Sequence, residues 1–172
     1  MTSTRMKQLR GRLREVSLAA LLITSPAHVR YLTGFSGSNG LAVVTASDAT
    51  LITDTRYGLQ SGQEVRGFRR RITKKGLLET AADARLLRGC AAAGFESRVV
   101  TYAEYRHLRS LFPRVSLRPT HDLVGEIALV KDKGEVEIMA RAAAIADRVF
   151  RDLISKITPG VTEMDVAAEV VW

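Results

Sequence analysis

The chain has 172 residues, of which 46% are hydrophobic and 26% charged, a composition typical of a globular protein with a substantial core. Its longest apolar run, residues 18–23, is too short to span a bilayer, which excludes a membrane-spanning helix and argues against a membrane partner. Cys90 is the only cysteine, which excludes an internal disulfide and a zinc site built from several thiolates.

The net charge of +8 requires nucleic-acid binding to be weighed against simpler explanations. Most basic residues are widely spread, and one local concentration lies at residues 66–75. This basic run falls on a predicted strand, residues 68–73, and has few aromatic residues for stacking on bases. The pattern favours an edge strand whose charges discourage sheet-to-sheet aggregation, and it argues against nucleic acid as a partner.

Taken in order, residues 6–119 alternate predicted helices and strands, which is typical of an α/β domain. The ends of these elements carry local signals, such as the Thr101–Glu104 capping box and the helix stops at Gly34 and Gly89. The predicted elements are helix 6–15, strand 18–24, helix 26–33, strands 41–45 and 50–53 as a hairpin, helix 55–65, strand 68–73, helix 77–88, strand 91–96, helix 102–112 and strand 115–119. Because the hairpin adds antiparallel neighbours, the sheet should not be purely parallel.

The pattern changes to long helices after residue 124. Asp132 and Glu135 can cap a helix with one apolar face, and Thr162 with Asp165 can cap a second helix that continues to the last residue without a stop signal. We therefore expect a domain boundary near Ile127, which divides the chain into residues 1–126 and a truncated second part, residues 127–172. The basic N-terminus leads into no signal-peptide core, so we expect a cytoplasmic protein.

A glycine-rich loop, Phe35-Ser-Gly-Ser-Asn-Gly40, follows the helix that ends at Gly34. Such a loop can bring its backbone N–H groups close to a ligand or to another chain, or it can be a tight crossover between packed elements. It lacks the lysine of a phosphate-binding loop and the spacing of a dinucleotide-binding loop.

Arg56 is the second candidate feature, because it lies in the first turn of the helix that follows Asp54. The helix macrodipole disfavours a cation at this end, so we expect the guanidinium to have a carboxylate partner. That partner is either structural, such as Asp54 or Glu64, or a bound ligand, since the planar fork of arginine can hold a carboxylate at two points.

Together these motifs resemble the N-terminal domain of prolidases, Xaa-Pro aminopeptidases and creatinase. The resemblance rests on five runs: His28-Val-Arg-Tyr-Leu-Thr-Gly-Phe-Ser-Gly-Ser-Asn-Gly40, Thr53-Asp-Thr-Arg-Tyr57, Gly94-Phe-Glu96, Leu129-Val-Lys-Asp-Lys-Gly-Glu135 and Ile157-Thr-Pro-Gly-Val-Thr-Glu163. The sequence departs from the family pattern at His28, where the family usually has Asn, and at Ala128, where an Arg is common.

This resemblance implies a mixed sheet of about six strands flanked by helices, a ribonuclease H-like fold, followed by the first helices of a truncated pita-bread domain. It also implies that the whole protein is a metallopeptidase with two divalent ions, manganese or cobalt, held by two Asp, one His and two Glu. All five ligands would lie beyond residue 172, so we expect this chain to contain no catalytic residue and no metal site of its own. Its three histidines, His28, His107 and His121, form no local ligand pattern.

In related dimers, loops of this domain reach the partner subunit's active site. By that resemblance Phe35, Ser36, Gly37, Ser38 and Asn39 would line the mouth of the partner's site in a homodimer that hydrolyses short proline-containing peptides. Arg56 and Tyr57 would bind a substrate carboxylate or brace the loop, and His28 is the third candidate for a substrate-binding or structural role.

Two other functions remain open from the sequence. One is a peptide- or histone-binding module without catalysis, as in the peptidase-like domain of the FACT histone chaperone. The other is a creatinase-like enzyme that acts on a small guanidino acid, because the residues that would decide between substrates lie in the missing part.

Overall fold

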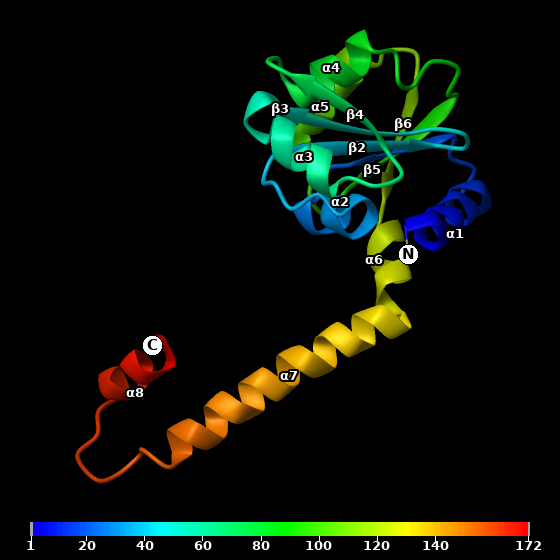
Figure 1. Ribbon diagram of the computed structural model, residues 1–172. Helices are drawn as coiled ribbons and strands as arrows, with labels where there is room; N and C mark the ends of the chain where they lie inside the picture. The colour runs from blue at the N-terminus through cyan, green and yellow to red at the C-terminus, as the bar shows by residue number, and fades with distance from the viewer. Residues whose placement is uncertain (1, 172) are drawn as a thin grey trace. The chain divides into compact units, whose positions relative to one another are not determined.

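The computed structural model describes residues 2–171 (Figure 1). Its elements, in chain order, are α1 (Thr2–Glu15), β1 (Ala20–Ile23), α2 (Pro26–Thr33), β2 (Gly40–Thr45), β3 (Ala49–Asp54), the 3₁₀ turn η1 (Thr55–Tyr57), α3 (Gly58–Glu64), β4 (Arg69–Thr73), α4 (Leu77–Asp83), β5 (Ala92–Glu96), α5 (Tyr102–Leu111), β6 (Ser116–Thr120), α6 (Leu123–Leu129), α7 (Lys133–Ile154) and α8 (Glu163–Val171).

The strands form one mixed, six-stranded sheet in the order β4-β3-β2-β1-β5-β6. β2 runs antiparallel to both of its neighbours, β1 and β3, whereas the remaining pairs are parallel. The predicted hairpin and the mixed sheet of six strands are thus confirmed. The basic strand β4 lies at one edge of the sheet, as its charge pattern predicted.

Both faces of the sheet are covered by helices, and the two cores come from alternate residues of the same strands. Leu21 and Ile23 of β1 pack into a core with α1 and α2. Leu22, between them, packs into the opposite core with residues of α4 and α5, and Figure 1 shows these two helices on the other face of the sheet from α1 and α2. A central strand that is buried on both faces has to be apolar at every position, which explains the continuous apolar run at residues 18–23.

One predicted helix is wrong in length. The helix expected at 77–88 ends at Asp83, and the chain continues through turns up to Gly89. Arg85 takes a left-handed conformation, with φ 51°, and the change of direction places Leu87, which is 3% exposed, in the core. Burial of Leu87 therefore outweighs the helical register that would have used Leu86.

Helix α6 was not predicted, because it is only two turns long. Asp122 accepts a hydrogen bond from the backbone N–H of Gly125 at 3.1 Å, and this caps the helix. Val124 and Ile127, three residues apart, are buried with the α1–α2 core.

The chain separates into two compact units, Met1–Leu129 and Val130–Trp172. In the second unit, Asp132 and Glu135 form the predicted capping box of α7, and Thr162 and Asp165 cap α8 through reciprocal hydrogen bonds. Lys156 forms an ion pair with Glu169 of α8. Among the described helices, none is long and apolar enough to cross a membrane.

The central strand provides a first prediction. Leu22→Ala should lower the free energy of unfolding by about 2–5 kcal/mol, because Leu22 is fully buried and its loss leaves a cavity. Leu59→Ala, at a position that is 79% exposed, is the control and should change stability by less than about 0.5 kcal/mol. Urea unfolding followed by circular dichroism measures both, and equal effects would contradict the central position of β1.

Candidate functional site

The glycine-rich loop begins where α2 ends at Gly34. Gly34 has φ 84°, and its backbone N–H donates to the carbonyl of Arg30, the left-handed helix stop that the sequence predicted. A Cβ atom at this position would also lie 3.0 Å from the carbonyl oxygen of Glu64. The loop therefore starts pressed against the end of α3, which a larger residue would push away.

Phe35 turns its ring into the protein rather than toward solvent. The side chain is fully buried, and its ring meets that of Tyr57 edge to face, with 5.5 Å between the centroids. The backbone passes directly over this ring, because a Cβ atom on Gly37 would lie 2.3 Å from its nearest carbon. Phe35 therefore contributes only its backbone to the loop surface, and the exposed loop side chains are Ser36 and Ser38.

Ser36 is held by the last residue of α3. Its backbone N–H donates to Oε2 of Glu64 at 2.7 Å, and its hydroxyl donates to Oε1 at 2.8 Å. Gln60 donates to both groups, at 2.9 Å to the Ser36 hydroxyl and 3.0 Å to Glu64. The hydrogen bonds from Ser36 lower the pKa of Glu64, so this carboxylate stays ionised and keeps accepting from the loop.

The other end of the loop is tied to Arg56 through Asp54. Nε and Nη2 of Arg56 donate to the two oxygens of Asp54, at 3.1 and 2.8 Å, and Asn39 donates to the same carboxylate at 2.6 Å. The hydrogen bonds from Arg56 and then Asn39 hold the pKa of Asp54 far below its ordinary value. Arg56 has the expected carboxylate partner, and of the two structural candidates it is Asp54, since Glu64 binds Ser36.

Tyr57 completes this network. Its hydroxyl shares a hydrogen bond of 2.8 Å with the hydroxyl of Ser38, while its ring packs on Phe35. Loop residues 35–39 are therefore joined to Arg56 and Tyr57 in one constellation. Its outer face offers two serine hydroxyls and the guanidinium of Arg56, which is 71% exposed and whose Nη1 makes no hydrogen bond within the described residues.

His28 belongs to a different cluster. Its Nδ1 lies 2.5 Å from Oε1 of Glu96, a buried carboxylate at the end of β5, and its Nε2 lies 3.6 Å from Asp122. Oε2 of the same Glu96 accepts from the backbone N–H groups of Thr24 and Ser25, at 2.6 and 2.8 Å. It thereby provides an acceptor for the two N–H groups that directly precede α2. The hydrogen bond from His28 to Glu96 raises the pKa of His28, against an opposing effect of burial.

The sequence pattern does not indicate either of the two carboxylates beside His28. Glu96 lies in a run that resembles a family motif, and Asp122 carries no local signal except its position before α6. Ser25, which precedes α2, makes no side-chain cap hydrogen bond, and its backbone N–H donates to Glu96. No three His, Cys, Asp or Glu side chains in residues 2–171 are grouped so that they could hold a metal ion.

Sequence and structure comparisons show which known proteins this chain resembles. The sequence profile described as the Creatinase/Prolidase N-terminal domain matches residues 5–130. The chain belongs to this family. The peptidase YqhT of Bacillus subtilis is 36% identical over 168 residues, which is 96% of this chain and 47% of that protein.

Solved structures of creatinase/prolidase family members share the fold. An Xaa-Pro dipeptidase from Bacillus anthracis superimposes with a TM-score of 0.91 at 28% identity, over 98% of this chain and 47% of that one. The N-terminal domain of the peptidase PepQ from Mycobacterium tuberculosis, solved by itself, superimposes with a TM-score of 0.64 at 32% identity, over 72% of this chain and 97% of that one. The chain spans about half the length of the curated relatives it matches.

The passage of the backbone over Phe35 gives a second prediction. Gly37→Ala should destabilise the protein by about 1–3 kcal/mol, because the new methyl group overlaps the ring of Phe35 and the loop must move. Gly58→Ala is the matched control: Gly58 is helical, with φ −54°, and has open space at its Cβ, so alanine should be neutral or stabilise by about 0.4–1 kcal/mol. Thermal unfolding of the two variants separates the predictions, and equal melting temperatures would contradict the close approach.

The His28–Glu96 pair gives a third prediction, on pH dependence. Since the folded pKa of His28 is raised above 6.5, its contribution to stability is complete below pH 6.5 and is lost as the pH rises through the folded pKa. His28→Asn should remove this part of the pH dependence, whereas His121→Asn, at an exposed histidine, should keep it. Urea unfolding at about pH 5.5 and about pH 8.5 measures the difference. If the free energy of unfolding changes between the two pH values as much in His28→Asn as in the unaltered protein, the pH dependence does not come from His28.

Proposed function

We propose that this chain is the N-terminal portion of a longer Xaa-Pro peptidase, a hydrolase that acts on short proline-containing peptides. The observation that carries the proposal is the match of residues 5–130 to the family profile, combined with relatives of about twice this length. Xaa-Pro dipeptidases of two Pyrococcus species are among these relatives. The division of the chain after Leu129 supports a domain boundary near Ile127, with residues 127–172 as the first helices of the catalytic part.

The whole enzyme would hold two divalent metal ions, manganese or cobalt, which supply an activated water molecule for peptide hydrolysis. The described residues do not fit such a site, because they contain no group of three metal-ligating side chains. In this proposal the chemical step belongs to residues beyond this chain, and the present domain shapes the entrance to the active site. The cytoplasm is the proposed location.

In a homodimer, the loop at residues 35–39 would line the mouth of the partner subunit's active site. Its anchoring supports this role: Phe35 is buried beneath it, Glu64 holds Ser36, and Tyr57 holds Ser38. A loop fixed at these points keeps its shape when it meets another surface, and little conformational entropy is lost on contact.

Arg56 would serve chiefly to brace the loop. It orients Asp54, which in turn holds Asn39, so its first function is in the network. Its remaining Nη1 group leaves a second function open to the same residue, the binding of a substrate carboxylate.

The proposal is tested by expressing the chain together with the coding sequence that follows it and assaying Xaa-Pro dipeptides and tripeptides with added manganese or cobalt. Activity is expected in the longer protein and not in the 172-residue chain. The absence of both activity and metal ligands from the longer protein would overturn the peptidase proposal in favour of a binding module.

The loop's role gives the fourth prediction. In the longer enzyme Ser38→Trp should raise KM for an Xaa-Pro tripeptide by about tenfold or more, because a bulky exposed side chain narrows the mouth of the partner's site. Ser47→Trp, the same change at an exposed serine of the β2–β3 turn, should leave KM within about twofold. Light scattering should give the mass of a dimer for both variants, and equal KM values in the two would contradict the role of the loop.

A further inference from the structure

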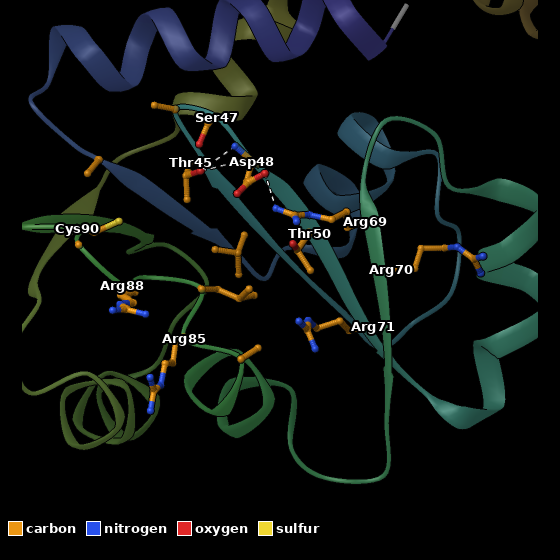
Figure 2. A pocket seen from close by; sticks show the side chains of 16 residues that line it. Thr45, Ser47, Asp48, Thr50, Arg69, Arg70, Arg71, Arg85, Arg88 and Cys90 are labelled. Atoms are coloured by element: carbon orange, nitrogen blue, oxygen red, sulfur yellow. Dashed lines mark hydrogen bonds and ion pairs between the residues drawn. The ribbon is translucent and has the colours of Figure 1, made fainter.

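A concavity of about 590 Å³ lies on the face of the sheet that α4 and α5 cover (Figure 2). Its boundaries are strand β4, the turn between β2 and β3, and the turns at residues 84–90. It exists because α4 ends at Asp83, so the helix does not extend over this part of the sheet. A volume of this size is typical of small-molecule sites.

Strand β4 supplies arginines to the concavity from alternate positions. Arg69 pairs in register with Thr50, and Arg71 pairs with Ile52, whose side chain lies in the core with α4 and α5. Arg70 pairs with Leu51, whose side chain lies in the opposite core, and its guanidinium rests against Gly62 of α3. Figure 2 shows Arg69 and Arg71 on the pocket side of the strand and Arg70 on the other side.

Across the pocket, the turn that follows α4 supplies Arg85 and Arg88 (Figure 2). Arg69 forms an ion pair with Asp48, the only acidic residue of the lining. Arg71, Arg85 and Arg88 make no side-chain hydrogen bond or ion pair with any residue that the structure describes. Five arginines thus line one concavity with a single carboxylate among them, and of these Arg70 turns its guanidinium to the other side of β4.

Protection of an edge strand explains the arginines of β4 but not those of the turn after α4. Charges on β4 discourage pairing with another sheet, but Arg85 and Arg88 come from a turn that has no free strand edge to protect. Like charges gathered around a concave surface raise the electrostatic potential there, and a bound anion lowers it. The excess of arginine on both walls therefore favours an anionic ligand.

We propose that this pocket binds a small molecule that carries a diphosphate group. A carboxylate is planar and is satisfied by one arginine, as Asp54 is by Arg56 in the same protein. A tetrahedral phosphate presents oxygens in several directions and can accept from both walls at once, and two linked phosphates match the charge of three unpartnered guanidiniums. The lining contains no aromatic residue on which a nucleic-acid base could stack, which favours a compact ligand over a nucleic-acid strand.

This inference goes beyond the proposed peptidase function and can be tested without it, because the pocket lies within the 172-residue chain. Isothermal titration with pyrophosphate at low salt should show saturable binding to one site. Arg71→Gln and Arg85→Gln, one from each wall, should each weaken binding by about tenfold, since each removes a charge-assisted hydrogen bond.

Arg70→Gln is the matched control, since it removes the same charge from the same strand on the other face. It should weaken binding by less than about twofold. Circular dichroism should show unchanged folding of all three variants, because all three side chains are exposed. Equal weakening by Arg70→Gln would overturn the proposal, as would the absence of pyrophosphate binding.

Three further probes test the ligand class. Inorganic phosphate and citrate should bind at least about tenfold more weakly than pyrophosphate, and a single-stranded oligonucleotide should not compete with it. Equal binding of phosphate would overturn the requirement for two phosphates, and equal binding of citrate would overturn the phosphate chemistry. Tighter binding of the oligonucleotide, lost in Arg71→Gln, would replace the small ligand by nucleic acid.

Discussion

The burial of Phe35 is the contact on which the candidate site depends. The ring is covered by Gly37 and Gly40 and supported at its edge by Tyr57, so the loop is shaped from beneath by close packing. Only glycine lets the backbone pass this close to an aromatic ring. The result is a loop whose apolar anchor is hidden while the exposed side chains of Ser36 and Ser38 form its surface.

Three carboxylates reinforce this arrangement, and each is the last residue of its element. Asp54 ends β3, Glu64 ends α3 and Glu96 ends β5. Each accepts hydrogen bonds from backbone N–H groups or side chains of a neighbouring segment, which would otherwise lack partners. In this family member, ionised side chains thus serve to join loops and helix ends, and at Asp54 and Glu64 the lowered pKa shows that the ionised form is the one stabilised.

The two faces of β4 illustrate how one strand meets different requirements. Its position at the edge of the sheet favours charged side chains, and three consecutive arginines occupy its first three positions. The alternation of the strand then divides them, with Arg70 against α3 and the other two toward the pocket beside α4. Because α4 ends at Asp83, part of the sheet beside β4 stays uncovered, and the strand forms one wall of a concavity.

Local sequence signals predicted the order and type of nearly all the elements, the hairpin and the caps of α5 and α7, because capping boxes, glycine stops and periodicity act over a few residues. They also indicated that Arg56 needs a carboxylate. The pairing of each carboxylate with its donor and the end of α4 depend on long-range contacts of the folded chain. Glu64 and Ser36 are 28 residues apart in the sequence, and Glu96 and His28 are 68 apart. No local pattern encodes contacts over such separations, because they follow from how the strands pair. The end of α4 follows in turn from the burial of Leu87 in the core.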